Sequence, residues 1–468
     1  MEIIVKDRIC GGGKSKGMVD YIKKSVKSNS GELFLYITPY LEQCHTLAGT
    51  KPISDEDQRP YYDKDGIKYT ENEYNLGCVQ IKHPDNRNSV GAKQESLRRL
   101  MNNSEHIIST HNLFLNMKLD TLSNAENFTL IVDEALDVFD RCKLLSEKEV
   151  KKLLRLKILY LKGDSITLGF DRKKFGDLLA LEEGEDAVED TSYEELAVLC
   201  DNNQILLVNG SVMLWEFSAE ILKKFKKVFI LTYLFEGREM SVYLKKHGLA
   251  YTVDRDGDGG KDVAHLIEVL DDEKLNSVGE NYFALSISKT RSSKRKRYEP
   301  EAKDYATKDK FDLALKRYRN YVESYDAKTL SAMETNDILR KNLHTVFSTR
   351  WKAKANDRLF TCLSVNSSYV AGKNYKNNWL GYSTRATNLF METHHVAFIM
   401  NVFMQPTIKQ VCDSTEYEVD EDLVALSHLI QFVFRSAVRK KEKIKVYIPS
   451  SRMRGLFQDY LNGVYDNV

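Results

Sequence analysis

The segment GGGKS, residues 11–15, is the sequence feature that most constrains how this chain folds. A short strand-like run, Glu2 to Val5, precedes it, and residues 17–26 carry apolar side chains at the spacing of one helix face. Between a strand and a helix, glycines let backbone N–H groups turn inward, and the helix N-terminus favours negative charge. The sequence therefore predicts a phosphate-binding loop, in which Lys14 reaches the β- and γ-phosphates of a nucleotide and the Ser15 hydroxyl binds Mg²⁺. The predicted nucleotide-binding residues are Gly11, Gly12, Gly13, Lys14 and Ser15.

The full phosphate-loop pattern, G-x-x-x-x-G-K-[ST], has a glycine where this chain has Arg8. A solvated glycine turn followed by a charge is therefore the alternative interpretation. The downstream stretch FTLIVDEALDVF favours the phosphate loop, because its apolar residues predict a buried parallel strand that ends in Asp133 and Glu134. In such a site Asp133 holds Mg²⁺ through water and Glu134 orients the attacking water. Two solvated acids at a strand end are the alternative.

Composition limits the class of protein. The chain has 468 residues, of which 42% are hydrophobic and 29% charged, as in a globular protein of several domains. The seven cysteines are scattered and form no C-x-x-C pair, so neither a disulfide framework nor a zinc site is expected. The sequence contains no run of eighteen apolar residues, so no membrane span is expected. The sequence opens in a strand rather than in an apolar signal segment. We expect a cytoplasmic protein without a membrane partner. Because the net charge is only +1, any nucleic-acid contact has to come from local basic patches.

Strand-like runs alternate with helical segments such as residues 90–101, which predicts an α/β fold with parallel sheets covered on both faces. Two such domains are expected. An insertion interrupts each of them, one at about 139–215 and the other, which opens with the basic run RSSKRKRY, at about 290–350. The strand-like runs are Leu33–Ile37, Cys78–Ile81, His106–Ser109, Thr129–Val132, Val228–Leu231, Leu359–Leu363, Val396–Val402 and Ile444–Ile448.

The order of short motifs resembles that of superfamily 2 helicases of the DEAD/DEAH-like group, in the compact form carried by bacteriophages. GGGKS resembles motif I, YITPYLEQC motif Ia, IISTHNLF the adjoining Thr-His segment, VDEAL motif II, VFILTYLFEG motif III, YSTRATNLF motif V and QFVFRSAVR motif VI. Motif II has Leu136 where the family usually has Asp or His, and motif III keeps Thr232 without the usual Thr-Ala-Thr. The resemblance implies two RecA-like P-loop domains, at 1–250 and 276–468, with a connector at 251–275.

The same resemblance implies contacts to nucleic acid from both domains, with Thr38 meeting a backbone phosphate. The basic run 291–297 is interpreted as a further phosphate-contacting patch, with tyrosines nearby for base stacking. A solvated loop is the alternative interpretation of that run. The predicted nucleic-acid contacts are Thr38, Thr110, His111, Arg385, Thr387, Arg295 and Arg297.

Motif VI is expected on one helix, residues 423–440, with Asp420 as its N-cap. At about 100° per residue, Gln431, Arg435 and Arg439 fall within one arc of about 80°. Both arginines then point together across a cleft, with Arg435 as the γ-phosphate contact. Arg439 is expected either to pair with a carboxylate at the domain interface or to assist closure. An amphipathic helix with solvated arginines is the alternative.

Two further clusters suggest metal ions but are assigned other roles. DRDGDGGKDVAH has acids spaced like an EF-hand loop, yet its twelfth position is His265 rather than Glu, so a solvated connector is expected. His394 and His395 are adjacent on the approach to a strand, where side chains should point to opposite faces, and are interpreted as structural.

Together these features predict an ATP-dependent motor on nucleic acid, in particular a phage DNA helicase or translocase in the host cytoplasm. ATP and Mg²⁺ are the expected cofactors. The expected partners are nucleic acid, DNA before RNA, and replication or recombination proteins. An ATP-regulated nucleic-acid clamp or switch with little unwinding is the first alternative, and a P-loop NTPase that never touches nucleic acid is the second. The predicted catalytic residues are Glu134, Gln431, Arg435 and Arg439.

Overall fold

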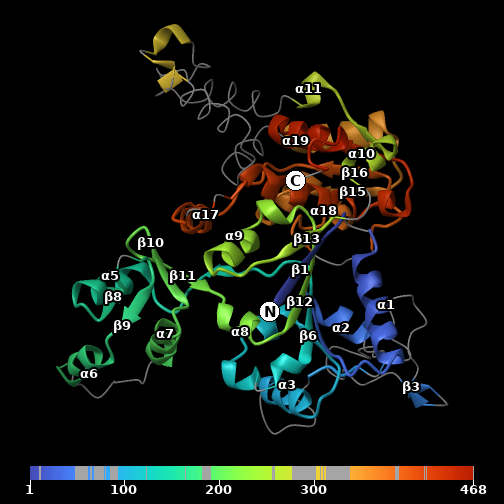
Figure 1. Cartoon of the computed structure of the whole chain (residues 1–468). Helices are drawn as coiled ribbons and strands as arrows, with labels where there is room; N and C mark the ends of the chain where they lie inside the picture. The colour runs from blue at the N-terminus through green and yellow to red at the C-terminus, as the bar shows by residue number, and fades with distance from the viewer. Residues whose placement is uncertain are drawn as a thin grey trace. The chain divides into compact units, whose positions relative to one another are not determined.

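The computed structural model in Figure 1 divides into two compact units, and the chain passes between them more than once. The first unit comprises residues 1–7, 13–255 and 404–420, and the second comprises residues 8–12, 256–403 and 421–468. The structure describes residues 1–9, 12–47, 62–63, 66–67, 79, 81–84, 93–122, 124–163, 165–181, 191–255, 259–276, 302–305, 307–308, 310–311, 338–384, 389–415, 417 and 419–466.

A six-stranded parallel sheet, ordered β13-β1-β12-β6-β2-β5, forms the centre of the first unit. Strand β6 is buried along its whole length, as expected for a parallel sheet covered on both faces. The strands predicted from the sequence for this sheet all form, and their observed ends differ from the predicted ends by at most two residues. The exception is the run 78–81, of which Cys78 and Gln80 lie outside the described residues. The strands are β1 (Glu2–Asp7), β2 (Leu33–Thr38), β5 (Ile107–Thr110), β6 (Phe128–Asp133), β12 (Lys227–Thr232) and β13 (Thr252–Asp254).

Helix α1 covers one face of this sheet. Its residues Met18, Val19 and Ile22 are buried together with Phe34 and Tyr36 of β2. The other face of the sheet packs into a second, larger apolar cluster. The remaining elements around the sheet are α1 (Lys14–Lys27), α2 (Leu41–Leu47), β3 (Tyr62–Asp63), β4 (Gly66–Ile67), α3 (Lys93–Asn102), α4 (His111–Leu115), η1 (Leu119–Leu122), η2 (Ala125–Asn127), α8 (Ala219–Lys223), η3 (Phe235–Gly237) and α9 (Glu239–Lys246).

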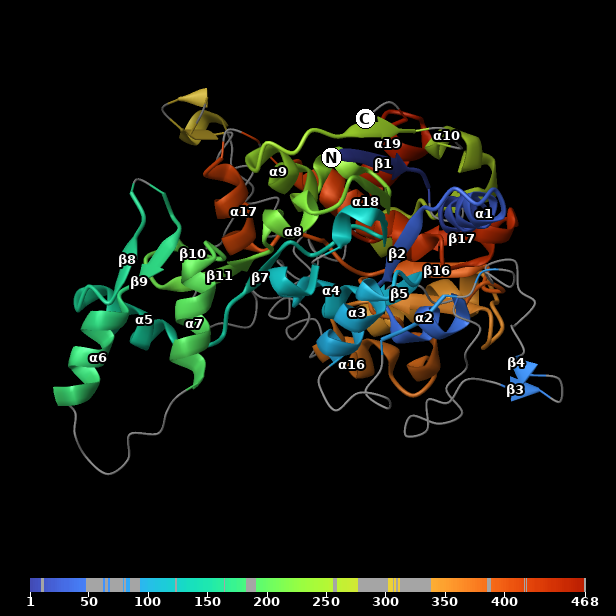
Figure 2. The same cartoon turned by 60° about the horizontal axis from the view of Figure 1, so that its bottom comes forward.

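The segment predicted as an insertion, residues 139–215, has a small core of its own, in which Leu153, Leu168 and Leu196 are buried. Figure 2 shows its helices and strands as a separate green group. Helix α17 (Pro406–Asp413), which comes from much later in the chain, packs on α9 and on strands β10 and β11. The elements of the insertion are β7 (Phe139–Arg141), α5 (Glu147–Arg155), β8 (Leu159–Leu161), β9 (Leu168–Phe170), α6 (Arg172–Leu181), α7 (Thr191–Asp201), β10 (Ile205–Val208) and β11 (Val212–Glu216).

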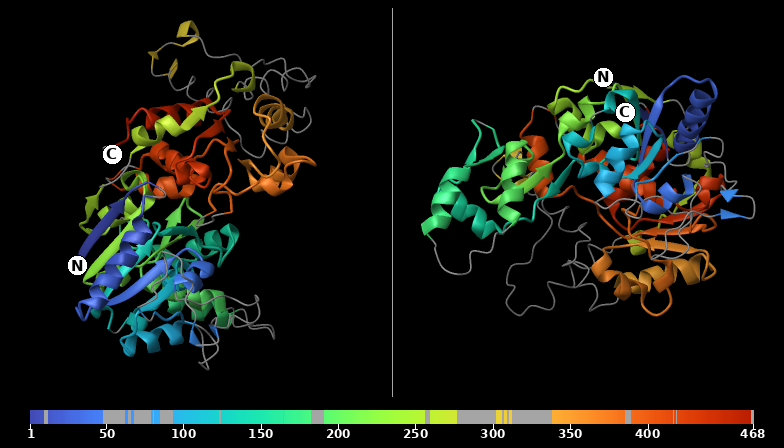
Figure 3. Two further views of the ribbon diagram at one scale, coloured as in Figure 1. Left: turned by 90° about the vertical axis from the view of Figure 1, so that its right-hand side faces the viewer. Right: turned by 90° about the horizontal axis from the view of Figure 1, so that it is seen from below.

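The second unit contains a four-stranded parallel sheet, ordered β14-β17-β16-β15, whose later strands and helices are orange and red in Figure 3. All three strands predicted after residue 350 form, although β16 ends at Phe398 rather than at Val402. The strands are β14 (Ile267–Val269), β15 (Arg358–Thr361), β16 (His395–Phe398) and β17 (Ile444–Tyr447). The helical elements are α10 (Gly260–Val263), η4 (Ala264–Leu266), α11 (Glu273–Asn276), η5 (Ala302–Asp304), α15 (Ile338–His344), the π-helix η6 (Thr345–Arg350), η7 (Ser364–Asn366), α16 (Ser367–Ala371), η8 (Lys376–Asn378), α18 (Glu421–Val433), η9 (Ala437–Lys440) and α19 (Ser451–Leu461).

The predicted connector, residues 251–275, is not a simple connector. Its first strand, β13, pairs with β1, where Lys6 and Asp254 form an ion pair, and its second strand, β14, pairs with β17. Each half of the segment therefore completes a different sheet. Most of the predicted basic insertion, including Arg295 and Arg297, lies outside the described residues. No helix in the described part of the chain is long and apolar enough to cross a membrane.

Candidate nucleotide-binding site

Polar residues end all five of the neighbouring strands β1, β12, β6, β2 and β5. Because the strands are parallel and their last residues are in register or one residue apart, these ends form one row along the carboxyl edge of the sheet. Parallel sheets bind ligands at this edge. The row consists of Asp7, Thr232, Asp133, Thr38 and Thr110.

The glycine loop joins the first of these strands to α1. Gly13 has a φ of 76°, in the left-handed region that disfavours other residues, and it immediately precedes the first residue of the helix. The N–H of Gly12 donates to the Ile9 carbonyl at 3.0 Å, and a Cβ on Gly12 would lie only 3.0 Å from the same oxygen. The left-handed backbone favours glycine at position 13, and the close approach to the Ile9 carbonyl leaves little room for a side chain at position 12. Gly11 lies outside the described residues.

Lys14 reaches across the carboxyl edge of the sheet. Its Nζ donates to the carbonyl oxygen of Thr232 at 2.9 Å, at the end of the strand between β1 and β6. The hydroxyl of Thr232 is buried and has no hydrogen-bond partner in the described part of the structure. The ammonium of Lys14 thus lies at the carboxyl edge of the sheet, a charge that suits recognition of phosphate oxygens.

Ser15 and Asp133 are in direct contact. The hydroxyl of Ser15 lies 3.1 and 3.0 Å from the two carboxylate oxygens of Asp133, and the hydroxyl of Tyr36 donates to one of those oxygens at 3.0 Å. Burial, followed by the charge of Glu134, raises the pKa of Asp133 to about 6. A hydroxyl and a carboxylate are the hard oxygen donors that Mg²⁺ accepts, so these two residues fit the predicted metal role.

Glu134 has a backbone conformation that few non-glycine residues adopt. Its φ is 67°, and its N–H donates to the Leu231 carbonyl at 2.9 Å. Such left-handed residues are strained by about 1–3 kcal/mol and are enriched at functional sites. The strained backbone of Glu134 therefore supports a functional role for its side chain at the sheet edge.

Asp7 belongs to the site although the sequence did not single it out. One of its carboxylate oxygens accepts the N–H of Phe235 at 2.9 Å, and the other has no hydrogen-bond partner among the described residues. Burial raises the pKa of Asp7. The sequence signal that could have identified Asp7 is its position at the end of the strand that leads into the glycine loop. Tyr36 was missed as well, because its contact depends on how β2 pairs with β6.

The residues predicted to meet nucleic acid from the first unit are already hydrogen-bonded within it. Thr38 is buried, and its hydroxyl donates to the side chain of Gln43 at 2.7 Å. Thr110 caps α4 by accepting the N–H of Leu113. His111 is buried, with Nε2 2.8 Å from the backbone carbonyl of Asp133. In this structure Thr38 and His111 support the strand ends rather than presenting their polar groups to solvent.

Motif VI differs from the predicted continuous helix. Helix α18 ends at Val433, and the chain then turns, with the hydroxyl of Ser436 donating to the carbonyl of Val433. Arg435 lies buried in this turn, whereas Arg439 lies on the following 3₁₀-helix. The two arginines therefore do not share a helix face. Most of α18 is buried, and only Glu421, Asp422, His428 and Gln431 are partly or fully exposed. Gln431 keeps its place in the last turn of α18. Arg385 and Thr387 lie outside the described residues.

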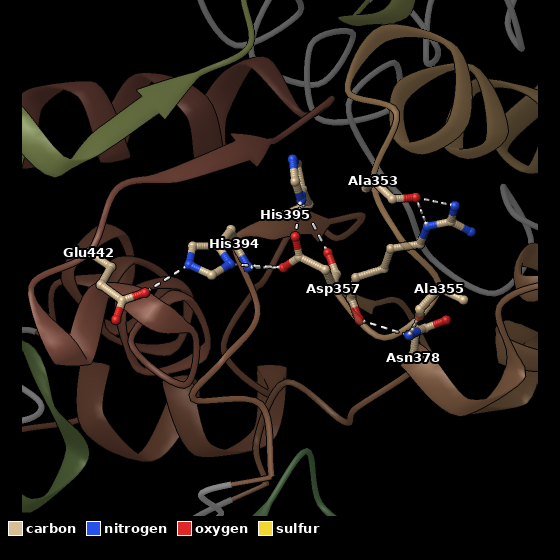
Figure 4. Close-up of polar contacts among 8 residues, drawn as sticks. Ala353, Ala355, Asp357, Asn378, His394, His395 and Glu442 are labelled. Atoms are coloured by element: carbon tan, nitrogen blue, oxygen red, sulfur yellow. Dashed lines mark hydrogen bonds and ion pairs between the residues drawn. The ribbon is translucent and has the colours of Figure 1, made fainter.

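The adjacent histidines of the second unit do not point to opposite faces. Both contact the carboxylate of Asp357, His394 through Nδ1 at 3.0 Å and His395 through Nδ1 at 3.1 Å (Figure 4). His394 also contacts Glu442 through Nε2 at 2.8 Å. Strand β16 begins only at His395, so the alternation of a strand does not yet apply to His394. Among the described residues, no group of three or more His, Cys, Asp or Glu side chains is arranged so that it could hold a metal ion. The structural role of the pair stays a prediction.

Comparisons with known proteins reveal similarity to a prophage protein. Residues 312–461 match a family described as the YonV C-terminal Rossmann-like domain. The chain is also 26% identical, over 476 residues, to the "SPbeta prophage-derived uncharacterized protein YonV" of Bacillus subtilis (strain 168), in a match that covers 98% of each chain. The chain is therefore an α/β protein with two parallel-sheet regions and a C-terminal Rossmann-like domain. Neither description names a helicase, so the helicase resemblance stays a prediction.

Proposed function

We propose that this protein is an ATP-dependent motor that acts on nucleic acid, most specifically a DNA helicase or translocase. The observation that carries the proposal is the grouping of Lys14, Ser15 and Asp133 at the carboxyl edge of the first sheet, where Ser15 and Asp133 touch. The strand, glycine loop and helix that position Lys14 are the arrangement from which phosphate-binding sites are built.

Each residue of the site has a distinct part in the proposed hydrolysis. The N–H groups at the start of α1 and the ammonium of Lys14 bind the phosphates, replacing the contact of Lys14 with the Thr232 carbonyl. Ser15 and Asp133 would hold a divalent ion, and that ion would supply positive charge to offset the charge of the transferring phosphoryl group. Glu134 orients the attacking water and accepts its proton. Arg435 or Arg439 is proposed to contribute charge stabilisation from the second unit.

The nucleic-acid half of the proposal rests on the motif order and on the presence of two parallel-sheet regions. The similar protein of B. subtilis is described as prophage-derived, in keeping with the bacteriophage group that the motifs resemble. We also propose that each of the two parallel-sheet regions has a RecA-like fold.

An ATP-regulated clamp or switch is the second candidate. Leu136, which stands where the family usually has a polar residue, is 3% exposed and belongs to the main apolar cluster. A buried leucine cannot provide a polar link from the carboxylates to motif III. Weak coupling between hydrolysis and strand separation would follow from this replacement.

The test compares ATPase rates without nucleic acid and with single-stranded DNA, double-stranded DNA and RNA. We expect stimulation by at least one of these polymers. Lys14→Ala should abolish hydrolysis and weaken ATP binding, while Glu134→Gln should bind ATP and turn over at least about 100-fold more slowly. Lys24→Ala, an exposed lysine on the same helix, is the matched control.

The outcomes separate the candidate functions. Near-normal hydrolysis by folded Lys14→Ala would remove the phosphate-loop assignment. Hydrolysis that no polymer stimulates would favour a simple NTPase. Stimulated hydrolysis without displacement of an annealed strand or movement along DNA would favour the clamp.

A further inference from the structure

A polar hollow lies in the second unit, before the amino ends of strands β15 and β16. Its volume is about 580 Å³. The segment that leads into β15, the turn around η8 and the residues that precede β16 enclose it. It is thus at the opposite edge of the sheet from the strand carboxyl ends. The lining side chains that matter here are Asn356, Lys373, Asn374, Lys376, Asn377 and Phe390.

The walls of this hollow are fixed by partly buried hydrogen bonds. The side-chain amide of Asn378 donates to the carbonyls of Ala355 and Arg358, at 2.8 and 2.9 Å, and so joins η8 to the start of β15 (Figure 4). Asp357 joins the same segment to His394 and His395. A ligand that enters the hollow therefore meets a preformed surface, which lowers the entropy cost of binding.

The lining polar side chains have unused hydrogen-bonding capacity. The amides of Asn356, Asn374 and Asn377 and the ammonium groups of Lys373 and Lys376 make no hydrogen bond or ion pair in the structure as described. All five residues are exposed. Three amides offer both donors and acceptors, and two lysines offer only donors.

The positive charge of the hollow is not compensated by neighbouring acids. No described lining residue carries a carboxylate. The nearby acids already contact other side chains: Asp357 contacts both histidines, Glu442 contacts His394, and Glu392 pairs with Lys440. Figure 4 shows the carboxylate of Asp357 directed at the histidines and away from Asn378. The two lysines are thus available to an anionic ligand.

We propose that this hollow binds a short stretch of single-stranded nucleic acid. Lys373 and Lys376 contact backbone phosphates, the asparagine amides hydrogen-bond base edges, and a base stacks on the half-buried ring of Phe390. The neighbouring Leu389 is 85% exposed and offers a second apolar contact to a base. The proposal rests on the proposed function for its nucleic-acid partner, and it adds a binding surface outside all of the helicase-like motifs except the last two residues of the motif V segment.

The test measures binding of a fluorescein-labelled oligothymidylate, and of the matching oligouridylate, by fluorescence anisotropy without nucleotide. The full chain with Lys373→Ala and Lys376→Ala should lose affinity on the order of tenfold, and its salt-dependence slope should fall by about 1.4, because each lost phosphate contact removes about 0.7. Phe390→Leu keeps an apolar side chain but should weaken binding on the order of tenfold through lost stacking. The control is Lys341→Ala with Lys354→Ala, two exposed lysines of the same unit that do not line the hollow.

The results separate this inference from the function on which it rests. If the lysine variant binds the oligonucleotides with the same affinity and the same salt-dependence slope as the wild-type protein, the proposal that the hollow binds nucleic acid is wrong. The motor proposal would not be affected by that result. Wild-type protein that hydrolyses ATP but binds neither oligonucleotide would overturn both the hollow and the nucleic-acid half of the function. Full competition by millimolar inorganic phosphate would identify a simple anion site and overturn the strand-binding proposal. An equal loss of binding in the control variant would do so as well.

Discussion

At the residue scale, the most informative side chain is Asp133, because it is buried at a site that requires its charge. Burial raises its pKa to about 6, above the ordinary value for a carboxyl group. A carboxyl with a raised folded pKa favours folding only while it is protonated, so this contribution is present below pH 4 and is lost as pH rises through about 6. A shift of about two pKa units corresponds to roughly 3 kcal/mol.

Asp133→Asn should therefore stabilise the nucleotide-free protein at pH 8 by about 1–3 kcal/mol and at pH 4.5 by at most about 1 kcal/mol, since the amide never ionises. Urea denaturation of both proteins at the two pH values measures this difference. The exposed Asp20→Asn is the control. A stability difference that does not depend on pH would show that ionisation of Asp133 has no such cost. Loss of ATPase activity in the stabilised variant is expected as well.

Tyr36 is the second residue with a testable role. Its hydroxyl donates to Asp133 at 3.0 Å from a fully buried position, so it orients the proposed metal-binding carboxylate. Tyr36→Phe keeps the packed ring and removes only this hydrogen bond, which to a charged group is worth about 1.5–3 kcal/mol. We expect the Mg²⁺ concentration for half-maximal ATPase activity to rise on the order of tenfold. An unchanged Mg²⁺ requirement, with normal folding, would contradict the orienting role.

At the element scale, the end of α18 changes what can be expected of the motif VI arginines. Arg435 lies in a turn and is 6% exposed, whereas Arg439 is half-buried on η9. Arg435→Ala should lower the free energy of unfolding by about 2–4 kcal/mol, because it empties a buried site, and Arg439→Ala by less than about 1 kcal/mol. Denaturation curves measure these effects.

Hydrolysis rates corrected for the folded fraction then test the catalytic assignment. A loss on the order of 1000-fold is expected for the arginine that contacts the γ-phosphate. We propose that role for Arg435, because its spacing from Gln431 matches the motif VI pattern that the sequence resembles. A larger rate loss in Arg439→Ala would reverse the assignment.

The elements also explain what the sequence could and could not predict. Strands such as β2, β6 and β12 are continuous apolar runs, and the glycine loop has short-range signals, so both were predictable. The end of α18 was not predictable, because no glycine or proline marks it and Ser436, whose hydroxyl donates to the Val433 carbonyl, resembles any other helical serine. Strand β13 was missed because it has three residues and its partner, β1, is at the other end of the domain. The role of Tyr36 could not be predicted, because its contact with Asp133 depends on the register between strands β2 and β6.

At the scale of the whole molecule, the first unit depends on a segment that the sequence assigned to the second domain. Val411 and Cys412 of α17 are almost fully buried in the main apolar cluster of the first unit. Val411→Ala should lower the stability of the first unit by about 1–2 kcal/mol, through lost burial and a residual cavity. Hydrogen exchange of the amides in α9 and β11 would detect this change. Gln410→Ala, exposed on the same helix, is the control, and equal exchange in both variants would contradict the packing.

The route of the chain through the units has a consequence for synthesis and cleavage. Residues 13–255 leave the ribosome long before residues 404–420, which complete the same core. The first unit therefore stays unfinished, with part of its apolar surface uncovered, until nearly the whole chain has been translated. Conversely, a protease that cuts once between residues 256 and 403 would not release a free N-terminal fragment, because α17 remains packed in that fragment's core. The two pieces of a nicked molecule should elute together and separate only in denaturant.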